Sequence, residues 1–110
     1  MVTDSAATGT APDQPRDQLW QLLAAIPRGR VTSYGRLAAL AGAGNAARWV
    51  GRQLAALPSD SALPWHRVVS SSGVIAARPG AERQLARLAA EGVICRNGRL
   101  RLADYLWEPA

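Results

Sequence analysis

Hydrophobic residues recur at helical spacing in several stretches of the chain, and the first of these is the clearest. Leu19, Leu22, Leu23 and Ile26 follow the i, i+3, i+4, i+7 pattern of a helix that is buried on one face. Proline disrupts a helix interior, so this helix should end at Pro27. Residues 1–13 are rich in small and polar residues without apolar periodicity, which predicts a disordered tail followed by one domain over residues 14–110.

Two shorter helices are predicted next, and a turn at residues 42–45 joins them. Thr32 or Ser33 can cap the first of these helices, which should stop at Gly42. Asn45 can cap the second, which should close at Pro58. Two short helices joined in this way are typical of a helix-turn-helix. Their apolar positions are Leu37 and Leu40 in one helix and Trp49, Val50, Leu54 and Leu57 in the other.

The last third of the chain predicts one more helix and a hairpin. Residues 81–91 carry leucines at helical spacing, and Gly92 follows in the position that ends many helices. Segments 93–95 and 99–102 then flank Asn97-Gly98, the dipeptide most favoured in two-residue hairpin turns. Helices followed by such a hairpin predict a mainly helical α+β fold, in the form of a winged helix-turn-helix-like domain.

The size and composition of the chain narrow the possible functions. With 110 residues, 48% of them hydrophobic, the chain can form one compact core but not two ordinary domains. Neither a bilayer-spanning run nor a secretory signal is apparent, so a cytoplasmic protein is expected. Cys95 is the only cysteine and His66 the only histidine, which argues against disulfides and structural zinc. No metal or cofactor is therefore predicted.

The charge of the chain favours an anionic partner. All 13 basic residues are arginine, against 8 acidic residues, for a net charge of +5. Without residues 1–17, which hold one arginine and three aspartates, 12 arginines face 5 acidic residues. Polyanions are the natural partners of such a domain. An arginine- and alanine-rich chain can equally reflect a GC-rich genome, so composition alone supports nucleic-acid binding only weakly.

One loop carries most of the functional information, with the sequence Pro64-Trp65-His66-Arg67-Val68-Val69. It resembles the active-site signature Pro-Cys-His-Arg-Val of the O6-alkylguanine-DNA alkyltransferases. It is more similar still to their alkyltransferase-like relatives, in which tryptophan stands at the position of the reactive cysteine. An indole has no lone pair that can attack an alkyl carbon. The resemblance therefore implies a binding pocket walled by Trp65, whereas the alternative for an isolated tryptophan is a place in the core.

The resemblance covers about residues 17–109 and implies roles for other residues around that pocket. Pro64 and Val68 match pocket positions, and Arg78 matches the loop that closes over the base, where it would sense alkylation of the guanine edge. His66 and Glu91 match residues that help to activate the thiol in the transferases. Without a thiol, a hydrogen bond between them would only support the loop. The chain has Leu57-Pro58 where the transferases often have Asn-Pro, which weakens a transferase interpretation further.

Arg48 lies in the predicted first turn of the third helix, where the positive end of the helix dipole disfavours a basic residue by about 0.3–1 kcal/mol. An anionic partner would reverse that sign. The segment around it also matches the family segment whose arginine enters the duplex where a base has left. Tyr34 matches the family tyrosine that promotes rotation of the nucleotide. The alternatives are that the arginines lie on a solvated surface and that Tyr34 is a half-buried anchor. The predicted DNA contacts are Ser33, Tyr34, Arg48, Gly51 and Arg52.

The hairpin and the C-terminal segment are given lesser roles. The hairpin arginines Arg96, Arg99 and Arg101 are predicted to be auxiliary phosphate contacts at best. Residues 104–109 resemble the end common to alkyltransferase-like proteins, and Leu106 or Trp107 should pack onto the core.

These features predict a non-enzymatic damage sensor that binds O6-alkylguanine in duplex DNA by nucleotide flipping. The resemblance implies that the protein marks the site for nucleotide-excision repair through UvrA-type proteins, and we expect a monomer associated with the nucleoid. Two alternatives stay open. A winged-helix transcription regulator would read base edges with the third helix. A residual alkyltransferase would use Cys95 or His66, although Cys95 fits better as a small core residue.

Overall fold

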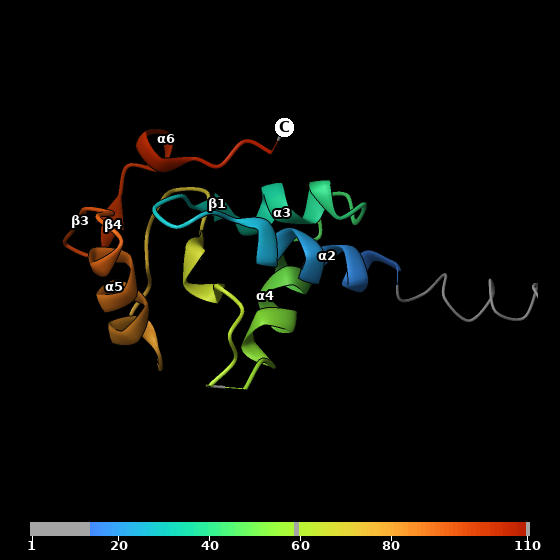
Figure 1. The fold of residues 1–110 in the computed structure, drawn as a ribbon, viewed down its shortest axis with the longest axis horizontal. Helices are drawn as coiled ribbons and strands as arrows, with labels where there is room; N and C mark the ends of the chain where they lie inside the picture. The colour runs from blue at the N-terminus through green and yellow to red at the C-terminus, as the bar shows by residue number, and fades with distance from the viewer. Residues whose placement is uncertain (1–13, 59, 110) are drawn as a thin grey trace, which may run out of the picture.

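The computed structural model describes residues 14–58 and 60–109, and Figure 1 shows helices as their main element. The predicted tail, residues 1–13, lies outside the described residues. The helices are α2 (Gln14–Ala25), α3 (Tyr34–Leu40), α4 (Ala47–Ala55), the 3-10 helix η2 (Trp65–Arg67), α5 (Ala81–Ala90) and α6 (Leu102–Tyr105). The strands are β1 (Thr32–Ser33), β2 (Val68–Val69), β3 (Cys95–Arg96) and β4 (Arg99–Leu100). The prediction of a mainly helical α+β fold is confirmed.

The first three helices pack around one hydrophobic cluster. α2 supplies Leu19 and Leu23, Ile26 follows directly after the helix, and α3 and α4 add residues that include Leu37 and Val50. Partly buried residues complete the cluster at its edge, among them Trp20, Trp49, Leu54, Leu57 and Trp107. Burial of this apolar surface stabilises the helix-turn-helix formed by α3 and α4.

A second cluster lies under α5 and the hairpin, and the β1–β2 pair separates it from the first. The two strands are parallel, with Thr32 opposite Val68 and Ser33 opposite Val69. Successive side chains of a strand point to opposite faces, so Val68 enters the first cluster and Val69 the second. The loop that carries Trp65 is thereby anchored between both cores. The second cluster is Val31, Val69, Ile75, Ala81, Leu88, Val93 and Leu100.

The predicted helix ends are partly right. Ser33 caps α3, since its hydroxyl accepts a hydrogen bond from the backbone N–H of Arg36 at 3.1 Å. The prediction that Asn45 caps α4 is wrong, because the helix begins one residue later than that would require. Ala46 holds the cap position and supplies no side-chain hydrogen bond. The backbone N–H groups in the first turn of α4 therefore receive no hydrogen-bond acceptor from the side chain at the cap position.

Two other apolar predictions need correction. Leu40 is 44% exposed, because the core face of α3 is formed by Leu37 and Ala38 and Leu40 lies about 200° around the helix from Ala38. The second hairpin strand ends at Leu100, and Leu102 opens α6 instead of continuing the strand. The hairpin turn itself is as predicted, with Asn97 and Gly98 both at positive φ, 54° and 73°.

The C-terminal segment returns to the beginning of the fold. The backbone N–H of Val31 donates to the Tyr105 carbonyl at 2.9 Å, and the N–H of Trp107 donates to the Val31 carbonyl at 2.8 Å. Trp107 packs against the first cluster, as predicted. Among the helices of residues 14–58 and 60–109, none combines the length and the apolar character required to cross a membrane.

Candidate functional site

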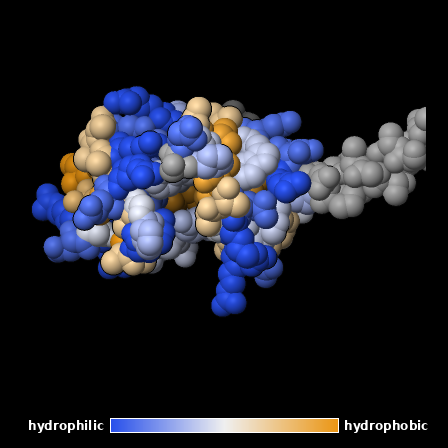
Figure 2. Space-filling view, turned by 90° about the horizontal axis from the view of Figure 1, so that it is seen from below, coloured by the Kyte–Doolittle hydropathy of each residue, from blue (hydrophilic) through white to orange (hydrophobic). Residues whose placement is uncertain are grey.

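A pocket of about 510 Å³ opens between α4, the loop of η2 and the start of α5. This volume lies in the range of about 300–1,000 Å³ that small-ligand pockets occupy. Figure 2 looks onto this side of the molecule from below and shows mostly hydrophilic residues around a hollow with a hydrophobic floor. The lining residues are Tyr34, Gly51, Leu54, Ala55, Leu57, Pro58, Trp65, Arg78, Pro79, Gly80 and Arg83. We call this the α4 pocket.

Trp65 forms part of the pocket wall and is only partly buried. The guanidinium of Arg87, from α5, lies over the indole with its carbon atom 5.4 Å from the ring centre. A cation at this distance is attracted to the negative face of the ring. The His66 ring stands perpendicular to the indole, at 88°, with the ring centres 6.1 Å apart. Both neighbours restrict the orientation of the tryptophan.

The backbone of the Trp65 loop is braced from α5 by Gln84, which is 1% exposed. Its amide nitrogen donates to the carbonyl of His66 at 3.2 Å and to that of Val68 at 3.0 Å. Its amide oxygen accepts from Arg78 at 3.0 Å, and Arg78 also donates to the Ala76 carbonyl. Gln84 therefore connects the tryptophan loop to the arginine on the opposite rim. The sequence reasoning missed this residue, although a glutamine on the apolar face of a predicted helix was a visible signal.

Glu91, at the end of α5, is the centre of a dense polar cluster. Its carboxylate accepts from Arg67 at 2.6 to 3.1 Å and from the backbone N–H of Gly29 at 3.1 Å. The predicted hydrogen bond with His66 is present at 2.8 Å. Arg67 also donates to the carbonyl of Ile26 at 2.7 Å. One carboxylate thus joins the end of α5, the tryptophan loop and the segment after α2.

The cluster shifts the pKa values of its members. Burial alone would raise the pKa of Glu91, but the hydrogen bonds from Arg67, His66 and Gly29 outweigh it and lower the pKa from 4.5 to about 2. Burial is also the largest influence on His66, and it lowers the pKa of the imidazole below 6.5 although Glu91 acts in the opposite direction. At neutral pH the carboxylate is therefore ionised and the imidazole is neutral.

These protonation states fix the tautomer of His66. A carboxylate can only accept, so the Nε2 atom that faces Glu91 must carry the proton. The other nitrogen, Nδ1, then has a lone pair, and it is buried without a hydrogen-bond partner among the described residues. The loop therefore retains a base, but its neighbour Trp65 has no acidic proton or nucleophilic atom for that base to activate.

The face of α4 beside the pocket is basic. Arg48 lies in the first turn of the helix, as predicted, and no acidic residue or side-chain cap offsets its charge there. Arg52 follows one turn later, and both side chains are exposed and make no hydrogen bond or ion pair within residues 14–58 and 60–109. Gly51 and Ala55, which line the pocket, share this face by helical spacing. The arginines therefore border the opening of the pocket without lining it.

The other predicted site residues divide into two groups. Tyr34 and Arg78 line the pocket together with Trp65. Ser33 is 2% exposed and its hydroxyl is used to cap α3, so its side chain is turned away from the surface that DNA would contact, and its predicted DNA contact stays a prediction. Val68 and Pro64 are not among the lining residues. Val68 is fully buried between β1 and the first cluster, and its carbonyl already accepts from Gln84.

Two further residues, Arg83 and Cys95, differ in their relation to the pocket. Arg83 lines the pocket from α5, so the rim has a second arginine on the side opposite α4, which the sequence reasoning missed. Cys95 lies on β3, packs against the second cluster and does not line the pocket. Burial raises the pKa of its thiol, which disfavours the reactive thiolate.

Comparison with known proteins gives consistent matches. The model of the family described as "6-O-methylguanine DNA methyltransferase, DNA binding domain" matches residues 14–93. A protein of Escherichia coli (strain K12) named "DNA base-flipping protein" is 49% identical over 92 residues, which cover 82% of this chain and 71% of that protein. "Alkyltransferase-like protein 1" of Schizosaccharomyces pombe is 35% identical over 105 residues, covering 88% of this chain and 97% of that protein.

The arrangement in space agrees with these matches. The crystal structure of S. pombe Atl1 in complex with damaged DNA containing O6-carboxymethylguanine superimposes with a TM-score of 0.82 at 34% identity. The match covers 88% of this chain and 97% of that one.

Proposed function

This chain belongs to the alkyltransferase-like proteins of the 6-O-methylguanine DNA methyltransferase family, and on that premise we propose that it is a non-enzymatic sensor of O6-alkylguanine. It binds duplex DNA and rotates the damaged nucleotide out of the base stack into the α4 pocket. Relatives named for base flipping and for alkyltransferase likeness support this function, as does the neighbouring structure that holds DNA with O6-carboxymethylguanine.

The observation that carries the proposal is the position of Trp65. The residue stands in the loop where the transferases have their cysteine, and it lines an open pocket instead of being sealed in either core. A flat aromatic wall can hold a base by stacking or packing. It cannot accept an alkyl group, so binding is the only step that this loop performs.

Residues from α3 and α4 open the duplex. Arg48 fills the space that the rotated nucleotide leaves, because it projects from the exposed first turn of α4 and has no partner within the described residues. Tyr34 presses on the phosphate next to the target from the pocket wall. Arg52 neutralises phosphate, and Gly51 leaves room for the backbone to approach.

Arg78 reads the lesion. Gln84 and the Ala76 carbonyl hold its guanidinium at the rim, so it is oriented before the base arrives. Unmodified guanine offers O6 as a hydrogen-bond acceptor, whereas alkylation lowers the negative potential there and adds apolar surface. Packing and cation–π contact then favour the alkylated base.

This protein does not repair the lesion, so another protein must remove it. We propose that the bound complex marks the site for nucleotide-excision repair through UvrA-type proteins, and that the protein acts as a monomer on the nucleoid in the cytoplasm. A complex that persists on the lesion is a signal in itself. Purified UvrA-type protein is expected to bind lesion duplex more tightly when this chain is present.

The test compares two duplexes that differ only by guanine or O6-methylguanine at one position, at a stated salt concentration. We expect tighter binding to the methylated duplex, with most of that preference lost in Arg48→Ala and Tyr34→Ala. Fluorescence of 2-aminopurine next to the lesion reports flipping, since unstacking raises its emission. The oligonucleotide should keep its methyl group throughout, as measured by mass spectrometry.

Equal affinity for the two duplexes would contradict the proposal. Affinity that follows the surrounding sequence and not the methyl group would support a winged-helix regulator instead. Loss of the methyl group with time, together with a mass increase on Cys95, would support a residual transferase.

A further inference from the structure

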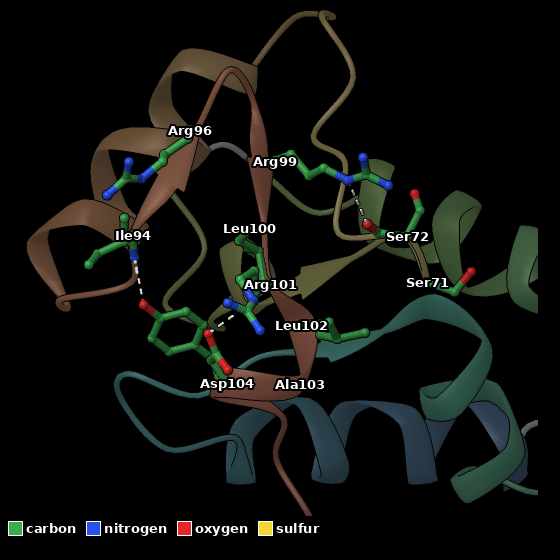
Figure 3. A pocket seen from close by; sticks show the side chains of 11 residues that line it. Ser71, Ser72, Ile94, Arg96, Arg99, Leu100, Arg101, Leu102, Ala103 and Asp104 are labelled. Carbon is green, nitrogen blue, oxygen red and sulfur yellow. Dashed lines mark hydrogen bonds and ion pairs between the residues drawn. The ribbon is translucent and has the colours of Figure 1, made fainter.

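A second hollow lies far from the α4 pocket, between the β3–β4 hairpin and α6, and has a volume of about 770 Å³. Figure 3 shows it with the side chains that line it. We call it the wing groove and define it by Ile94, Arg96, Arg99, Arg101, Leu102 and Tyr105. None of these residues takes part in the binding of a flipped base, so the proposed function leaves the groove unused.

The groove contains an exposed apolar surface. Ile94 is 60% exposed, the largest exposure of any large hydrophobic residue in the described part of the chain. Leu102 and the ring of Tyr105 line the same groove, and the Tyr105 hydroxyl accepts from the backbone N–H of Ile94 at 3.1 Å. Exposed apolar residues that gather in this way mark interaction sites.

Arginines surround that apolar surface. Arg96, Arg99 and Arg101 line the groove, and Asp104 is the only acidic residue among its lining. Asp104 is engaged with Arg101 at 3.5 Å, and the Nε atom of Arg99 donates to the Ser72 carbonyl at 3.3 Å. These contacts orient two of the guanidinium groups and leave their remaining donors available, as Figure 3 shows. The groove is therefore complementary to a negatively charged partner.

The position of the groove separates it from the proposed DNA site. In Figure 1 the hairpin and α6 lie at the upper left, whereas α4 and the segment before α5 lie at the bottom. The groove and the α4 pocket share no lining residue. A partner can therefore occupy the groove while α4 contacts DNA.

Nucleic acid explains the groove less well than protein does. Phosphates would satisfy the arginines, but a phosphate backbone offers no large apolar group to cover Ile94. A peptide with carboxylates on both sides of an apolar side chain satisfies both features at once. A hydrophobic centre surrounded by a polar rim is the usual composition of protein–protein interfaces.

We propose that the wing groove docks a short acidic segment of a partner protein. A large apolar side chain of that segment covers Ile94 and the ring of Tyr105, and carboxylates on either side of it pair with Arg96 and Arg99. This inference does not depend on damage recognition, because it uses none of the residues of the α4 pocket.

The test uses the full chain and a fluorescein-labelled peptide that has a central leucine between pairs of glutamates. Fluorescence anisotropy should give saturable binding, weakened by about tenfold or more in Ile94→Ser and in Arg96→Ser. Leu40→Ser and Arg30→Ser are the matched controls, since both residues are exposed and lie outside the groove, and they should leave binding unchanged. Serine for leucine in the peptide should weaken binding in the same way.

Several outcomes would overturn the docking proposal. These are no saturable binding of the acidic peptide, equal binding to Ile94→Ser, or tighter Ile94-dependent binding of a single-stranded oligonucleotide, which would assign the groove to nucleic acid. A dimer that dissociates in Ile94→Ser would assign it to a second copy of the chain. Lesion-duplex binding, measured on the same Ile94→Ser preparation, should equal that of the parent protein. That control separates failure of the groove from failure of the damage sensor.

Discussion

Arg67 and Arg48 have the same side chain in opposite surroundings. Arg67 is 16% exposed, forms hydrogen bonds with both oxygens of Glu91 and also reaches the carbonyl of Ile26. Arg48 is exposed in the first turn of α4, where the helix dipole is unfavourable, and has no partner within the described residues. The charges of Arg67 and Glu91 are paired within the fold, whereas the charge of Arg48 on α4 remains available for a partner.

The difference separates scaffold from binding surface in a chain whose basic residues are all arginine. A buried guanidinium is stable only when its donors are satisfied, so Arg67 and Glu91 must be retained together. An exposed guanidinium gains little from the folded state and can be exchanged without loss of structure. The proposed recognition of DNA needs both, because a rigid Trp65 loop is of use only beside a surface that holds the duplex.

The largest expected effect comes from breaking the scaffold. Glu91→Gln keeps the shape of the side chain but removes the charge that faces Arg67 and His66. Removing one partner of a buried ion pair costs about 3–5 kcal/mol, so urea denaturation should show a loss near that size. Glu108→Gln, at an exposed position, should change the free energy of unfolding by less than about 0.5 kcal/mol. A similar small change for Glu91→Gln would mean that the cluster does not hold the fold.

Acid should weaken the same region by a comparable amount. The pKa of Glu91 is lower in the folded state, about 2 against 4.5, so its contribution is fully present above about pH 5 and is lost as the pH falls toward 2. The expected loss is about 3 kcal/mol. The lowered pKa of His66 acts in the same direction and starts nearer pH 6.5. Urea titrations across this range measure the loss, and the lower part should be absent in Glu91→Gln.

The effect of intermediate size is on DNA binding, and it distinguishes the role of Arg48 from that of Arg52. Arg48→Ala should weaken binding to the O6-methylguanine duplex by about ten- to a hundredfold, because no side chain then fills the vacated space. Arg52→Ala should weaken binding to all duplexes alike and reduce the salt dependence by about one phosphate contact. Titrations of both duplexes at several salt concentrations distinguish the two patterns. Identical patterns would remove the special role of Arg48.

The smallest effect has the opposite sign. Arg48→Ala removes a positive charge from the first turn of α4, so the protein without DNA should become more stable by about 0.3–1 kcal/mol. Arg52 lies in the last turn, where the dipole favours a cation, so Arg52→Ala should not stabilise. Thermal or urea unfolding of the two variants makes the comparison. A less stable Arg48→Ala would show that Arg48 serves the fold after all.

Local patterns in the sequence predicted the helices well. The spacing of Leu19 and Leu23 gave the buried face of α2, and Asn97-Gly98 gave the hairpin turn, because both signals depend on neighbouring residues. The parallel pairing of β1 with β2 joins segments far apart in the chain, and no local pattern predicts such a contact. Asn45 has a side chain that favours the cap position, but it does not cap α4, because the helix begins at Ala47 and the cap position falls on Ala46.

The site was predicted to the extent that a motif marked it. Trp65, His66 and Glu91 came from the resemblance, and the hydrogen bond between the last two is present. Val68 was assigned to the pocket from its place in the motif, where a backbone contact with the base was expected, but its side chain is in the core and its carbonyl already accepts from Gln84. Arg83 was missed because its place at the rim depends on where α5 packs, which the sequence of that helix alone does not specify. Gln84 was missed although a polar residue on an apolar helix face needs buried partners, which here are the carbonyls of His66 and Val68.

The backbone bonds between Val31 and residues 105 and 107 have a consequence for biosynthesis. A ribosome completes α2, α3 and α4 long before it adds the segment that closes over Val31 and covers the first cluster with Trp107. During synthesis the nascent chain must therefore keep an apolar flank uncovered until residues 105–107 have left the exit tunnel, and such intermediates are prone to aggregate.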